Sequence, residues 1–78
     1  MPYSSKQVTR ALGREGFSES DGTGHSGSHR TYYRRRDPDL SQTVTVVLGK
    51  REIPTGTLRN YARQLGITLD ELILWLDK

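Results

Sequence analysis

The sequence predicts an α+β sandwich in which helices cover one face of a small antiparallel sheet. Apolar residues recur at helical spacing near both ends of the chain, whereas apolar and polar residues alternate in its middle. The chain has 78 residues, which predicts a single domain over residues 1–78. The expected order is a helix, two or three short strands, a second helix and a short final helix.

The first helix is expected to begin at Ser4 or Ser5, because serine is a favoured N-cap residue. Val8, Ala11 and Leu12 then follow at the spacing of one helical face. Gly16 suits the left-handed position that follows many helices, so the helix is expected to end just before it.

The middle of the chain predicts a short edge strand and a hairpin. Residues 17–28 are polar and rich in glycine, which leaves room for a short edge strand followed by a turn or loop. Residues 29–35 predict a strand, in which either Tyr32 or Tyr33 faces the core and the other faces solvent. Residues 36–39 predict a turn. Residues 42–48 give the clearest strand, with an inward apolar face formed by Val44, Val46 and Leu48.

Two helices are expected in the last third of the chain. The first of them starts near Pro54, with Thr55 or Thr57 as its cap, and Gly66 ends it. The next starts with a capping box formed by Thr68 and Glu71. The expected buried residues are Leu58, Tyr61, Ala62, Leu65, Leu69, Leu72, Ile73 and Leu76, together with Trp75, which would dock a partner if it were exposed instead.

The composition limits the possible functions. Lysine and arginine total 12 against 9 acidic residues, and only Lys78 of the basic residues lies beyond residue 66. This distribution is compatible with a polyanion partner, or with a charged surface that only gives solubility. The absence of cysteine excludes disulfides and thiolate metal sites, and two histidines cannot close a structural zinc site. With no apolar run long enough for a membrane span, a cytoplasmic protein is expected.

The segment Gly27-Ser28-His29 is the strongest candidate for chemistry. Glycine lets a phosphate approach the backbone closely, and histidine can exchange a proton near neutral pH. RNA cleavage needs little more, because the 2′-hydroxyl of the substrate is itself the nucleophile. Cations that offset charge on the phosphate are expected among Arg30, Arg34, Arg35, Arg36, Lys50 and Arg51. A tripeptide of this kind also occurs by chance, and His25 reads as a solvated loop residue.

An ordered series of short motifs resembles a known family. The motifs are Gly16-Phe17, Gly27-Ser28-His29, Val44-Thr45-Val46, Glu52-Ile53, Gly56-Thr57-Leu58-Arg59 and Leu65-Gly66-Ile67. In this order they resemble the HicA toxins of type II toxin–antitoxin systems, over most of the chain from about Ser5 to Leu76. One departure is that Val47-Leu48-Gly49-Lys50 stands where many members carry a Pro-x-His segment.

The resemblance implies a fold like a double-stranded-RNA-binding domain, with an α-β-β-β-α order and an added C-terminal helix. It also implies an mRNA interferase, that is, an endoribonuclease that uses His29 and needs neither a metal nor another cofactor. A HicB-type antitoxin would bind the monomeric toxin in a hetero-oligomer and inhibit it. A non-catalytic RNA-binding module, or an interaction protein whose charge serves only solubility, are the alternatives that the residues leave open.

Overall fold

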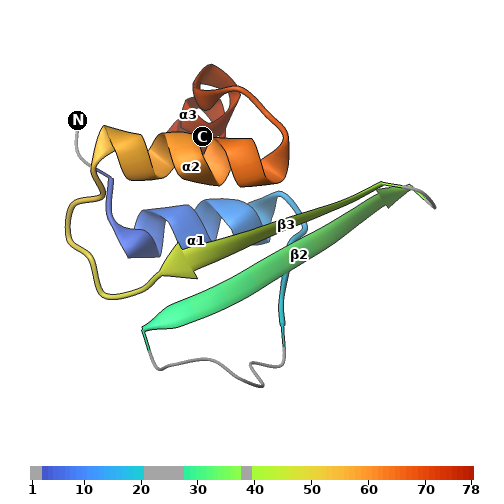
Figure 1. Ribbon diagram of the computed structural model, residues 1–78, viewed down its shortest axis with the longest axis horizontal. Helices are drawn as coiled ribbons and strands as arrows, with labels where there is room; N and C mark the ends of the chain where they lie inside the picture. The colour runs from blue at the N-terminus through green and yellow to red at the C-terminus, as the bar shows by residue number, and fades with distance from the viewer. Residues whose placement is uncertain (1–2, 21–27, 38–39) are drawn as a thin grey trace.

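The computed structural model describes residues 3–20, 28–37 and 40–78. Along the chain, the elements are α1 (Ser5–Arg14), β1 (Ser18–Glu19), β2 (His29–Asp37), β3 (Leu40–Val47), α2 (Thr55–Leu65) and α3 (Leu69–Asp77) (Figure 1). This order and the sheet described next confirm the predicted α+β sandwich. Within these described ranges, no helix has the length and apolar character that crossing a membrane requires.

The sheet has the order β1-β2-β3, and both of its pairings are antiparallel. The β2–β3 hairpin forms most of it, with His29 opposite Val47 at one end and Asp37 opposite Leu40 at the other. β1 contributes only two paired residues, Ser18 and Glu19, as expected for a short edge strand. In Figure 1 the hairpin runs obliquely past the helices, and the start of β2, the end of β3 and the start of α1 lie at the same end of the molecule.

The two faces of the hairpin differ sharply in burial. Val44 and Val46 have no exposed surface, and Tyr32, which pairs with Val44, is 7% exposed. Tyr33, the next residue on β2, points to the opposite face and is 49% exposed. The helices therefore pack on one face of the sheet and leave the other open to solvent, which settles which tyrosine faces the core.

The buried apolar side chains form one cluster that joins the inner face of the sheet to all three helices. Its members are Val8, Ala11, Leu12, Phe17, Tyr32, Val44, Val46, Ile53, Leu58, Tyr61, Ala62, Leu65, Leu72, Trp75 and Leu76. The predicted core positions of the helices are confirmed, except that Leu69 and Ile73 are only half-buried. Trp75 is 6% exposed and belongs to the core rather than to a docking surface.

Side chains cap two of the three helices. Ser4 and Gln7 form a reciprocal capping box at the start of α1, and Thr68 Oγ1 accepts the Glu71 N–H over 3.1 Å at the start of α3. The prediction that Thr55 or Thr57 caps α2 is wrong. Pro54 occupies the N-cap position in an extended conformation, and no side chain bonds the free amides there.

The turn predicted over residues 36–39 is shorter in the structure. β2 continues through Asp37, which pairs with Leu40, and the register shifts between Arg35 and Asp37. A shift of this kind places an extra residue on one strand, so residue 36 belongs to an irregular strand end rather than to the turn. Residues 38 and 39 lie outside the described residues.

Two side chains of helix α2 accept hydrogen bonds from backbone amides at the outer edge of β3. The Tyr61 hydroxyl accepts the Val47 N–H over 3.0 Å, and Gln64 Oε1 accepts the Thr45 N–H over 2.9 Å. These amides would otherwise form an open sheet edge, which readily pairs with other chains. Two side chains of a core helix therefore replace the strand that is missing at this edge.

The guanidinium of Arg34 joins several elements at the other end of the hairpin. Its Nε and Nη2 donate to Gln42 Oε1 over 3.0 and 2.6 Å, and its Nη1 donates to the Glu15 carbonyl over 2.6 Å. Gln42 in turn donates from Nε2 to the Leu65 carbonyl over 2.9 Å. The network therefore connects β2 and β3 to the ends of α1 and α2.

Two aromatic rings flank the same guanidinium. The Arg34 Cζ lies 4.7 Å from the centroid of Phe17 and 5.3 Å from that of Trp75, within the range of cation–π attraction. The two rings are tilted by 55° with their centroids 6.0 Å apart. Through Trp75, the network also reaches α3.

Replacing Arg34 by Met is expected to destabilise the fold by about 2 to 4 kcal/mol, because Gln42 and the Glu15 carbonyl lose their donors in a partly buried site. Lysine should recover little of this, since it lacks the planar fork. Urea unfolding measures the effect, and Arg35→Met is the matched control because Arg35 is exposed on the same strand. Equal losses in the two Met variants would contradict this role.

Replacing Tyr61 by Phe is expected to cost about 1 kcal/mol, because the Val47 amide loses its acceptor. Hydrogen exchange at the Val47 amide should accelerate at the same time. Tyr33→Phe is the control, because that hydroxyl lies on the open face and its loss should change stability by less than about 0.5 kcal/mol. Unchanged protection of Val47 would argue against the edge-capping role.

Candidate functional site

His29 is exposed at the very start of β2. Its neighbours are fixed in place: His29 pairs with Val47, and the Ser28 carbonyl accepts the Leu48 N–H over 2.6 Å. The Ser28 hydroxyl lies 3.3 Å from His29 Nδ1, within hydrogen-bond distance. The ring is thereby contacted at Nδ1, and no hydrogen bond joins Nε2 to any of the residues that the structure describes.

Strand alternation places His29 on the open face of the sheet. The side chains of His29, Thr31, Tyr33 and Arg35 follow one another on this face, because alternate residues of a strand point the same way. Tyr33 is the large aromatic side chain of that row. The sequence left open which of the two tyrosines is exposed. Tyr33 lies an even number of positions after His29 on the strand, and this spacing could have placed it on the same face as the histidine.

Arg30 lies on the other face and is paired with Glu19. Its Nη1 is 2.9 Å from Glu19 Oε1, in an ion pair exposed to solvent. The hydrogen bond that Arg30 donates to Glu19, and then the Glu19 charge, raise the pKa of the Arg30 guanidinium above its ordinary value. Burial, and then the Glu19 charge, raise the pKa of the neighbouring Tyr32 hydroxyl. The Glu19 carboxylate therefore already compensates part of the positive charge of Arg30.

The structure separates the remaining arginines expected from the sequence. Arg35 is exposed on the face that carries His29, about 20 Å along the strand. Arg34 instead points to the helices, where it holds the network described above. The strand backbone includes Arg36, whose side chain is not among those described, and Gly27 and His25 lie outside the described residues.

Lys50 and Arg51 lie in the loop between β3 and α2, and both are exposed. β3 ends at Val47, the residue opposite His29, so this loop starts beside the histidine. The structure therefore brings His29, Ser28, Lys50 and Arg51 to one end of the hairpin, while Arg35 lies toward the other end.

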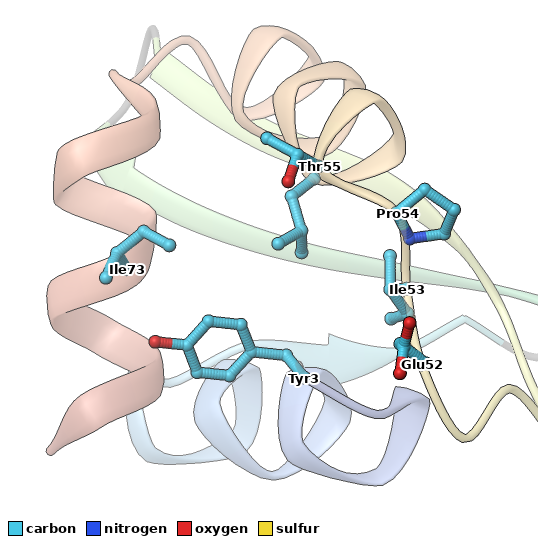
Figure 2. Close-up of a pocket in the computed structure, with 7 residues that line it drawn as sticks. Tyr3, Glu52, Ile53, Pro54, Thr55 and Ile73 are labelled. Atoms are coloured by element: carbon cyan, nitrogen blue, oxygen red, sulfur yellow. The ribbon is translucent and has the colours of Figure 1, made fainter. Parts of the chain in front are cut away.

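A pocket away from His29 lies where the N-terminal segment meets the start of α2 and the middle of α3 (Figure 2). It has a volume of about 490 Å³, and Tyr3, Ile53 and Ile73 are among its lining residues. Tyr3 donates its hydroxyl proton to Asp77 over 2.7 Å, a bond that raises the pKa of that phenol. None of the predicted site residues lines this pocket, and its one charged group is Glu52, which does not suit a polyanion.

In the described part of the chain, no three histidine or acidic side chains lie close enough together to hold a metal ion. The described side chains at the site are the imidazole of His29, the hydroxyl of Ser28 and the nearby cations of the loop after β3. Such a set can exchange a proton and bind an anionic group.

The chain is similar to a family of known proteins. The family model described as HicA toxin of bacterial toxin-antitoxin matches residues 5–67, which include α1, the whole sheet with His29, and α2. No curated protein matches the chain. Because the match covers most of the chain, this protein belongs to the HicA family of toxins of bacterial toxin–antitoxin systems.

Proposed function

We propose that this protein is an mRNA interferase, a toxin that cleaves messenger RNA with His29 as its catalytic side chain and without a metal cofactor. Membership of the HicA family supports a toxin that acts on RNA. The observation that carries the assignment is the position of His29, which is exposed, fixed by the end of the hairpin and close to a basic loop.

The proposed reaction is an internal phosphoryl transfer. The 2′-oxygen of a ribose attacks the adjacent phosphorus, the bond to the 5′-oxygen breaks, and the products are a 2′,3′-cyclic phosphate and a 5′-hydroxyl. One proton leaves the 2′-hydroxyl and one is added to the 5′-oxygen. A single imidazole serves one of these transfers in each event, and water serves the other.

Ser28 and the nearby cations have supporting roles in this proposal. The Ser28 hydroxyl contacts Nδ1 and so orients the ring with Nε2 toward the substrate. Lys50 and Arg51, in the loop that starts beside the residue paired with His29, would contact the phosphates, together with Gly27 and Arg36 from the sequence pattern. Arg30 contributes despite its ion pair, and Arg35 serves a more distant part of the strand. We leave Arg34 outside the RNA contacts because its donors bind Gln42 and Glu15.

His29→Ala is expected to lower the rate of RNA cleavage by about 10² to 10⁴-fold, the usual contribution of one general acid–base group. Cleavage of a labelled RNA in the presence of EDTA measures this rate and tests the independence from metal. The fold should be unaffected, because the ring is exposed. Thr31→Ala on the same face is the matched control. RNA binding with no cleavage by the unmodified protein would favour a non-catalytic RNA-binding module.

A HicB-type antitoxin is the proposed partner. Expression of this protein alone is expected to arrest growth, and co-expression of the small open reading frame next to its gene should restore it. The two products should purify together as a hetero-oligomer, whereas the toxin alone should be monomeric, as light scattering would measure. If His29→Ala still arrests growth, the toxicity does not come from the proposed cleavage.

A further inference from the structure

We infer that a basic pocket beside the start of α1 binds a phosphate of the RNA strand other than the one that is cleaved. The inference rests on the proposed function, since it assigns a second contact to the same substrate. The pocket has a volume of about 320 Å³ and is lined by Ser4, Ser5, Lys6, Gly49, Lys50 and Arg51.

Three of the six lining residues are cations, and none is acidic. Lys6 comes from the first turn of α1, whereas Lys50 and Arg51 come from the loop after β3, so only the folded chain brings them together. The sequence alone does not predict this convergence, because Lys6 and the loop after β3 lie far apart along the chain. Among the described residues, no acidic group forms an ion pair with any of the three, whereas Arg30 is paired with Glu19.

The wall of the pocket is held by hydrogen bonds of Ser5. Its buried hydroxyl donates to the Val47 carbonyl over 2.7 Å and accepts the Lys50 N–H over 3.0 Å. The Ser5 N–H also donates to the Lys50 carbonyl over 2.9 Å. Gly49 makes the tight turn just before Lys50, with a φ of 77° that residues with a Cβ rarely adopt. The backbone that carries Lys50 is therefore already in place before a ligand arrives.

The pocket is close to His29. Val47, whose carbonyl accepts the Ser5 hydroxyl proton, is the residue paired with His29 in the hairpin. The Cα atoms of a cross-strand pair are about 5 Å apart, and three further residues separate Val47 from Lys50. The Cα atoms of His29 and Lys50 are therefore at most about 16 Å apart. Figure 1 shows the start of β2, the end of β3 and the start of α1 gathered at this end. One RNA strand can therefore reach both the histidine and the pocket.

The lining favours a phosphate over a protein partner. Protein interfaces usually have an apolar centre, and no large apolar side chain lines this pocket. Two ammonium groups and a guanidinium suit the oxygens of a phosphodiester, and such contacts position a nucleic acid without reading its sequence. An acidic segment of the antitoxin is the competing occupant, and it predicts that RNA binding does not depend on the pocket.

The test compares two variants that each remove two positive charges. Lys6→Ala/Arg51→Ala changes the pocket, and Arg59→Ala/Arg63→Ala changes exposed positions on α2 as the matched control. Both are made in the His29→Ala background, and anisotropy of a short labelled single-stranded RNA gives the affinity at several salt concentrations. Unfolding curves verify that each variant is folded, and Lys6→Gln/Arg51→Gln replaces the first pair if it is not.

Loss of this phosphate contact should reduce the slope of log affinity against log salt by about 0.7, because each phosphate neutralised on a single strand contributes about 0.7. The control pair should change the slope much less. Equal slopes in the two variants would show that the pocket does not bind an RNA phosphate. Cleavage by the unmodified protein would in that case still support the proposed function. A reduced slope with no cleavage by the unmodified protein would support the pocket and reject the nuclease. Absence of any RNA binding would reject the pocket outright.

Discussion

The side chain of Arg34 ties the sheet to all three helices. Its guanidinium reaches Gln42 on the neighbouring strand and the carbonyl at the end of α1, and it lies against Phe17 and Trp75. A chain of this length has a small apolar core, so a network of charge-assisted hydrogen bonds adds specificity that apolar packing alone does not give. These bonds hold the hairpin against the helices at Arg34 and Gln42, whereas His29 lies at the opposite end of the hairpin.

That opposite end is fixed by different means. Ser5 bonds both Val47 and Lys50, and the Tyr61 hydroxyl accepts the Val47 amide proton. The backbone opposite His29 is thus held by α1 and α2, although the imidazole itself stays in solvent. A rigid support under an exposed group lowers the cost of orienting it for a proton transfer. This arrangement suits a toxin whose proposed chemistry depends on one side chain.

The sequence was sufficient for the order of the elements and for the inward positions of Val44 and Val46, which alternate with threonines. Leu48 was expected on the same face, but it follows the end of β3 and is only half-buried. The sequence was not sufficient for β2, where aromatic and basic residues occupy both faces. Once the register pairs Tyr32 with Val44, Arg34 must point to the helices as well, and it cannot share a face with His29. The position of His29 at a strand start was predictable from local signals. The convergence of Lys6 with Lys50 was not, because it depends on how α1 packs against the end of β3.

The hydrogen bonds from the edge of β3 to α2 oppose association of this protein with other copies of itself in concentrated solution. Gln64 and Tyr61 occupy outward amides of that strand, so a second molecule cannot add its own strand there and extend the sheet. On the β2 side, β1 blocks the middle of the edge, and the exposed charge of Arg35 discourages stacking nearby. Self-templated aggregation is therefore opposed at both margins of the sheet, while its open surface remains available for binding.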